Sequence, residues 1–186
     1  MLTKEEVSAV VGQHVTSVEG SGSSLTYKTD VMGFETSIEL EQKRGTDEAI
    51  QSLQGARTAT GILGGKPEAV PHLGDEAFFG AMSFLYVRKG DAFITITPPN
   101  LQMVAGMGAA QQVMNAKLGS DEQIKAMANL QQVEKTDPLN AGLKGGDDVQ
   151  GALAVVSAAS KKQGTDYEAQ ARTMAVALAA KLLEKM

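Results

Sequence analysis

The amino-acid sequence predicts an α+β fold, in which a mainly antiparallel sheet of about five strands is packed by N- and C-terminal helices. Three observations support this prediction. A helix with clear start and stop signals begins the chain. Short runs of β-branched and aromatic residues, separated by glycine turns, follow it. The clearest amphipathic helix ends the chain. With 42% apolar and 21% charged residues among 186, the chain can bury a core, so we expect a single domain over residues 1–186.

Residues 2–12 predict a short amphipathic helix at the start of the chain. Thr3 and Glu6 have the spacing of a capping box, and Gly12 stands where a helix commonly ends. Three strand segments follow, over residues 14–20, 23–30 and 34–42. Residues 19–24, EGSGSS, supply the turn between the first two strands. The third strand mixes apolar and acidic residues, as expected of a sheet with one solvated face.

The next part of the chain predicts a second helix and then a hairpin. Residues 45–58 carry their apolar side chains on one side, which is typical of a helix packed on a sheet. A connection broken by glycine and proline follows. Residues 82–99 then predict a β-hairpin, because two runs rich in Phe, Tyr, Val and Ile are joined by Lys89, Gly90 and Asp91.

After the hairpin the composition becomes rich in Ala, Gln and Met, and we expect a helical insertion over residues 100–160 within the single domain. Residues 149–157 fit either a helix or a buried strand, because periodicity does not separate the two. A last helix starts at Thr165, with Glu168 completing its capping box. One face of this helix carries Tyr167, Ala171, Met174, Leu178 and Leu182.

Composition excludes several classes of function. A net charge of −5 argues against a nucleic-acid partner, which needs a basic surface. The chain has no cysteine, so disulfides, thiol nucleophiles and thiolate metal sites are excluded. Its longest apolar run, residues 174–180, is too short to span a bilayer. Only two histidines are present and neither glycine-rich stretch fits a nucleotide loop, so we expect no metal and no cofactor.

The stretch PHLGDEAFFG before the hairpin holds the densest group of chemically active side chains. It supplies the candidate ligand-binding residues, together with one arginine of the hairpin: His72, Asp75, Glu76, Phe79 and Arg88. Adjacent residues of an extended chain point to opposite faces, so Asp75 and Glu76 are not expected to share a site. The favoured interpretation is structural, with a turn at Gly74 and Asp75 that leads into a strand, and no catalytic residue is assigned.

Five motifs occur in an order that resembles a known group. They are LTKEEVSAVVG, LTYKT, VPHLGDEAFFG, LYVRKGDAFITI and ARTMAVALAAKLL. Together they resemble a loose group of small bacterial exported and lipoprotein domains of unknown function. The resemblance covers residues 2–99 and the C-terminal helix, and Leu25 stands where the group usually has a cysteine. It implies an α/β sandwich-like fold and an extracytoplasmic location, and it carries over no catalytic residue.

Two functional hypotheses remain at this point. The first is a non-enzymatic binding or interaction module of the bacterial cell envelope, whose partner is a protein or a small apolar ligand. Its surface would be the loop near His72 or the methionine-rich insertion, through which the chain could also form a homodimer. The alternative is a hydrolase-like enzyme centred on His72. The expected location is extracytoplasmic, in the periplasm or the cell envelope, and a cytoplasmic location stays open.

Overall fold

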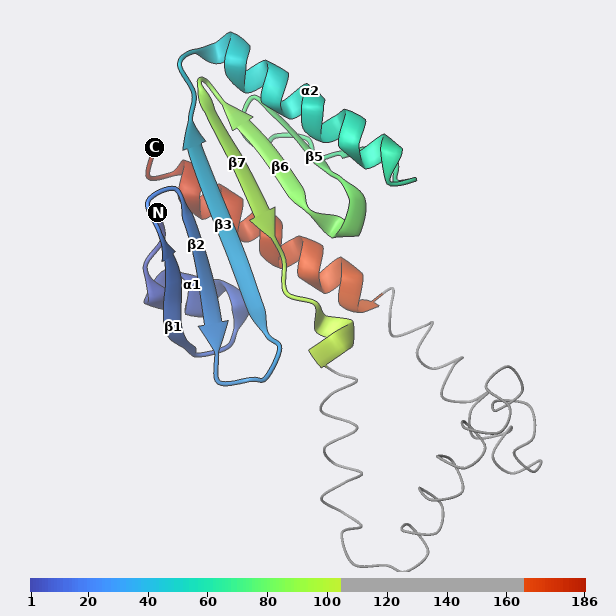
Figure 1. Cartoon of the computed structure of the whole chain (residues 1–186). Coiled ribbons are helices and arrows are strands. Elements are labelled where there is room, and N and C mark those ends of the chain that lie inside the picture. Colours follow the sequence, from blue (N-terminus) through green and yellow to red (C-terminus); the bar gives the residue numbers. More distant parts are fainter. Residues whose placement is uncertain (105–165) are drawn as a thin grey trace, which may run out of the picture. The chain divides into compact units, whose positions relative to one another are not determined.

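A computed structural model describes residues 1–104 and 166–186 (Figure 1). Residues 1–104 and 167–186 form one compact unit, so the last helix belongs to the same fold as the sheet. The predicted insertion over residues 100–160 lies outside the described residues, except for a helical turn at 101–104, and so does the ambiguous stretch 149–157.

The described residues contain a seven-stranded antiparallel sheet with the order β1-β2-β3-β7-β6-β5-β4. The strands are β1 (Val15–Ser21), β2 (Ser24–Thr29), β3 (Glu35–Gln42), β4 (Glu68–Ala69), β5 (Glu76–Phe79), β6 (Leu85–Lys89) and β7 (Ala92–Thr97). The predicted three strands and the hairpin are confirmed. The predicted total of about five strands is wrong, because β4 and β5 are too short to produce a readable alternation in sequence.

Helix α1 (Lys4–Val11) forms as the sequence predicts. The Thr3 side chain accepts from the backbone N–H of Glu6, the Glu6 side chain accepts from the backbone of Thr3, and both bonds of the capping box are present. Gly12 ends the helix in the left-handed conformation, with φ of 68°. This helix buries Val7 and Val11.

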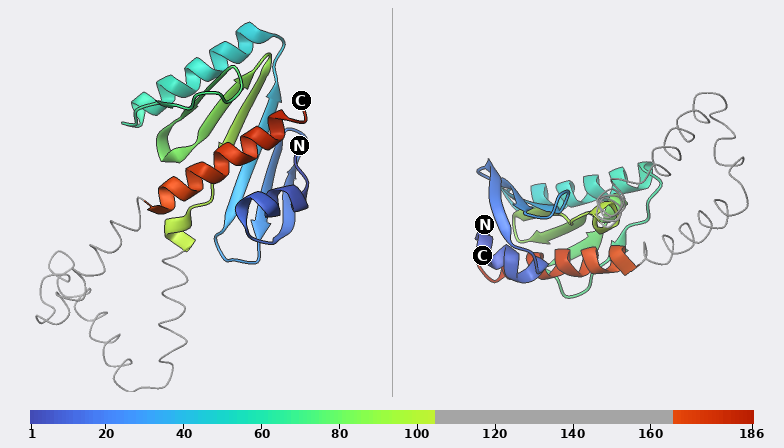
Figure 2. Two further views of the ribbon diagram at one scale, coloured as in Figure 1. Left: turned by 180° about the vertical axis from the view of Figure 1, so that it is seen from behind. Right: turned by 90° about the horizontal axis from the view of Figure 1, so that it is seen from below.

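Helix α2 (Thr46–Ile62) is longer than predicted and covers one face of the sheet. It continues through Gly61, which packing against the sheet tolerates although glycine weakens a helix. Leu53 packs with Phe78 and Phe93 in a buried cluster between α2 and the sheet. The predicted packing by the two terminal helices was therefore incomplete, since α2 occupies the face opposite to them (Figure 2).

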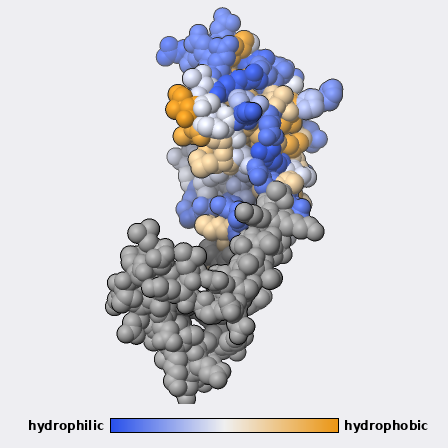
Figure 3. Space-filling view, turned by 90° about the vertical axis from the view of Figure 1, so that its right-hand side faces the viewer, coloured by the Kyte–Doolittle hydropathy of each residue, from blue (hydrophilic) through white to orange (hydrophobic). Residues whose placement is uncertain are grey.

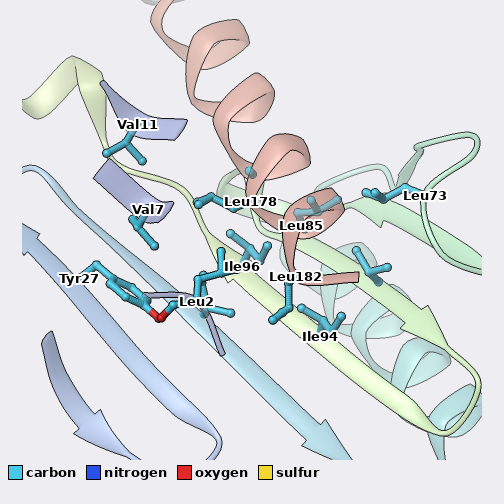
Figure 4. Close-up of a cluster of buried hydrophobic side chains, with 14 of the residues drawn as sticks. Leu2, Val7, Val11, Tyr27, Leu73, Leu85, Ile94, Ile96, Leu178 and Leu182 are labelled. Atoms are coloured by element: carbon cyan, nitrogen blue, oxygen red, sulfur yellow. The ribbon is translucent and has the colours of Figure 1, made fainter. Parts of the chain in front are cut away.

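The larger core lies on the other face, where α1 and the helix of residues 166–183 meet the sheet (Figure 4). Leu178 and Leu182 of the last helix are buried with Ile94 and Ile96 of β7. The predicted apolar face of this helix is thus confirmed at its buried positions, whereas Thr165, its predicted cap, lies outside the described residues. The two ends of the chain lie near each other (Figure 1), where the Lys185 ammonium pairs with Glu6 at 2.6 Å.

Tyr27 links the N-terminal segment to this core. Its ring is buried on β2, and its hydroxyl donates to the Leu2 carbonyl at 2.7 Å. Burial disfavours the charged phenolate and raises the pKa of Tyr27 above its ordinary value. The tyrosine therefore remains a neutral hydrogen-bond donor at physiological pH, and it fixes Leu2 in the core.

Candidate functional site

The loop between β4 and β5 carries His72, the centre of the alternative enzymatic hypothesis. His72 is exposed and adopts a left-handed backbone conformation with φ of 63°. Leu73 follows and is buried in the larger core. The loop therefore turns outward at the histidine and inward at the leucine, which leaves the imidazole in solvent.

Asp75 closes the turn between β6 and β7. Its backbone N–H donates to the Arg88 carbonyl at 2.8 Å, and its carboxylate accepts from the Gly90 N–H at 2.7 Å. Two cations add charge to the same carboxylate, Arg88 at 3.1 Å and Lys89 at 3.3 Å. The Gly90 N–H is the main reason that the pKa of Asp75 is lowered, and the two cations lower it further. Asp75 thus holds two chain segments together.

Glu76 and Phe79 contact two different helices. Glu76 pairs with Arg57 of α2 at 2.7 Å, and the Arg57 guanidinium lies 4.9 Å from the centre of the Phe78 ring. Phe79 points to the opposite face, where Arg172 of the last helix lies 4.9 Å from its ring centre. These contacts join β5 to the helix on each side of the sheet.

The five predicted site residues therefore do not converge on one ligand. Asp75 and Arg88 meet at the β6–β7 turn, Glu76 and Phe79 point to opposite faces, and His72 lies in solvent. The two carboxylates accept from cations and, at Asp75, from a backbone N–H, and neither pairs with His72 in the described part of the chain. Among residues 1–104 and 166–186, no three His, Asp or Glu side chains lie close enough together to hold a metal ion.

We expect Asp75→Ala to lower the free energy of unfolding by about 1 kcal/mol, because it removes the acceptor that pins Gly90, on a partly exposed turn. The lowered pKa means that the folded protein binds the proton of Asp75 less tightly than the unfolded chain does. The stabilisation is therefore complete above about pH 4 and is lost as the pH falls through the lowered pKa.

Urea denaturation at pH 7 and pH 3 measures this difference between the wild type and the variant. The gap should shrink at the lower pH. Asp75→Asn serves as the control, because it keeps an oxygen that can accept from Gly90 while removing the charge. A gap of the same size at both pH values would contradict the assigned role of the carboxylate.

The structure exposes two apolar side chains at the end of α2 and a third in a nearby turn, all of which sequence analysis missed. Ile62 is 80% exposed, Leu63 is 68% exposed, and Met82, in the short helical turn η1 (Ala81–Ser83), is 75% exposed. A Cβ added at Gly65 would lie 3.5 Å from the Cα of Ala81, so the segment after α2 lies against this turn. We call Ile62, Leu63 and Met82 the apolar end. Figure 3 faces the side on which α2 ends and shows strongly hydrophobic residues at separate places among hydrophilic ones.

The turn beside the apolar end is held by an ionic network from the last helix. The Ser83 hydroxyl donates to Glu168 at 2.8 Å and accepts from Arg172 at 3.3 Å. Arg172 also pairs with Glu168 at 2.9 Å and with Glu68 of β4. Met82 and Ser83 both have left-handed φ angles, of 54° and 61°, which non-glycine residues adopt only where the surroundings hold them.

Comparisons of this chain with protein-family models, with curated proteins and with solved structures find no match. Within the part that the structure describes, no helix combines the length and the apolar character needed to cross a bilayer. The geometry of the described residues is therefore the basis for a functional proposal.

Proposed function

We propose that this chain is a non-enzymatic binding module that docks a protein partner through its apolar end. The observation that carries the proposal is the exposure of Ile62, Leu63 and Met82, each more than two-thirds exposed on adjoining segments. Exposed apolar side chains are costly in water, and where a folded protein keeps several of them on adjoining segments, they commonly mark an interaction site.

The shape of the apolar end favours a protein over a small molecule. A small ligand needs a concave site that buries most of its surface. Side chains that are 68–80% exposed protrude instead, so they fit into an apolar recess on the partner. Three side chains bury much less than the roughly 800 Å² that each partner contributes to a stable complex, so we expect a weak or transient interaction.

The remaining parts of the proposal come from the sequence. The resemblance to exported and lipoprotein domains supports a place in the cell envelope, and cell fractionation with an antibody to the chain tests that location. The hydrolase alternative needs His72 to meet a carboxylate, whereas Asp75 and Glu76 pair with Arg88, Lys89 and Arg57, which does not support it.

A photo-crosslinking amino acid placed at 62 or at 82, in cells of the source organism, tests docking. We expect both positions to give one shared adduct, because both side chains enter the same partner. Leu63→Asp in the same chains should remove this adduct, since a carboxylate cannot enter an apolar recess without a large desolvation cost.

Met32 provides a matched control position, because it is 66% exposed on the loop between β2 and β3. A crosslinker at 32 should not give the shared adduct. The proposal is wrong if 62 and 82 give no common adduct, or if position 32 gives the same one.

The apolar end is also measurable with the purified protein alone. The dye 1-anilinonaphthalene-8-sulfonate fluoresces on exposed apolar surface, and we expect the combined Ile62→Asp and Met82→Asp variant to lower its fluorescence several-fold. Met32→Asp should leave most of the signal. An equal loss of fluorescence in both variants would show that the dye responds to exposed apolar side chains in general and not to the apolar end.

A further inference from the structure

Met82 is distinguished by its chemistry as well as by its exposure. The chain contains no cysteine, so methionine thioethers are its only sulfur groups that can be oxidised. Met82 is the most exposed methionine in the described part of the chain, at 75%, and Met32 follows at 66%. Met1 and Met174, by contrast, are partly buried against the larger core.

The backbone keeps Met82 in solvent. The Gly80 N–H donates to the Phe84 carbonyl at 2.8 Å, and the Phe84 N–H donates to the Ala81 carbonyl at 3.3 Å, which closes the turn on both sides of Met82. The network of Ser83, Glu168 and Arg172 fixes the next residue. An oxidant therefore reaches the Met82 sulfur without any unfolding of the chain.

We propose that Met82 is a site of reversible oxidation by peroxides, and that its sulfoxide weakens docking by the apolar end. This inference rests on the proposed binding function. The thioether sulfur attacks one peroxide oxygen, the O–O bond breaks, and the sulfur loses two electrons. The products are methionine sulfoxide and, from hydrogen peroxide, one molecule of water. A thiol-dependent sulfoxide reductase restores the thioether: two thiols supply two electrons and become a disulfide, and the sulfoxide oxygen leaves as water.

The structural consequence is confined to the surface. A sulfoxide is polar and accepts strong hydrogen bonds, so it resists transfer into an apolar recess. Met82 is not part of either buried cluster, so its oxidation leaves the core packing unchanged. The modification therefore changes binding without changing the fold.

Purified full-length protein treated with hydrogen peroxide and digested for mass spectrometry tests the first part. We expect Met82 to be oxidised at least about fivefold faster than Met174, because the Met174 sulfur is shielded by the core. Equal rates for the two residues would overturn the inference. Circular dichroism should not change at the stage when Met82 is fully oxidised.

Two leucine variants test the second part, with dye fluorescence as the readout. Met82→Leu cannot be oxidised at this position, so its fluorescence after peroxide treatment should equal its own untreated value, while the wild type loses about half or more of its untreated value. Met32→Leu is the matched control and should lose as much as the wild type. If Met82→Leu also loses its signal, Met82 is not the responsible residue and the inference is wrong.

The two proposals fail in different ways. Crosslinkers at 62 and 82 that give no common adduct contradict the proposed function itself. Untreated protein with the expected fluorescence, which oxidation of Met82 leaves unchanged, contradicts only the inference about oxidation.

Discussion

Leu178→Ala is expected to lower the free energy of unfolding by about 2–5 kcal/mol. Leu178 is fully buried on the helix of residues 166–183, where it packs against the sheet beside Ile94 and Ile96. Truncation to alanine loses the transfer free energy of the removed methyl groups and leaves a cavity, because the buried side chains around it relax only in part. Urea denaturation followed by circular dichroism measures the change.

Thr173→Ala on the exposed side of the same helix is the control, and it should change stability by no more than about 0.5 kcal/mol. A loss below about 1 kcal/mol for Leu178→Ala would contradict the packing of this helix on the sheet, since a fully buried leucine cannot be truncated so cheaply.

Gly74→Ala is expected to cost at least about 3 kcal/mol, because two independent penalties fall on one residue. Gly74 has φ of 64°, and an added Cβ would lie 2.5 Å from the Arg88 carbonyl oxygen and 2.8 Å from a Val87 methyl group. The Arg88 carbonyl belongs to the backbone of β6, and it cannot move aside as the end of a flexible side chain could. The loop would therefore have to move away from β6, which would also weaken the bond between the Asp75 N–H and Arg88.

Gly22 separates the two penalties of this substitution. It has φ of 62°, nearly the same as Gly74, and an added Cβ there would meet no atom within 4 Å. Gly22→Ala should therefore cost only the left-handed conformation, about 1 kcal/mol. Thermal denaturation of both variants gives the difference, and equal losses would mean that contact with β6 does not explain why Gly74 is a glycine.

Local signals in the sequence predicted the local parts of the fold. The capping box of Thr3 and Glu6 located the first helix, and the turn at Gly90 located the hairpin, because each depends on residues only a few positions apart. The end of α2 was not predictable in the same way. Gly61 indicates a break, yet the helix continues to Ile62, and Thr60 lies close to Gly80 only once the sheet has formed.

The candidate site shows the same limit. The sequence predicted the turn at Asp75, since Gly-Asp favours a turn on its own. It could not predict that Glu76 would pair with Arg57, because that pairing requires α2 to lie across β5. The exposure of Met82 could not be predicted either, because nothing in the neighbouring residues indicates a left-handed conformation that points a methionine into solvent.

The order in which the chain is made has a consequence for the sheet. The helix of residues 166–183 covers Leu85, Ile94 and Ile96, which are synthesised about half a chain earlier. During translation these side chains are not yet buried by that helix. The compact unit is complete only after residue 183 has left the ribosome. At ordinary elongation rates of about 5–20 residues per second, these strand side chains therefore lack the cover of the last helix for several seconds, which favours aggregation of the nascent chain.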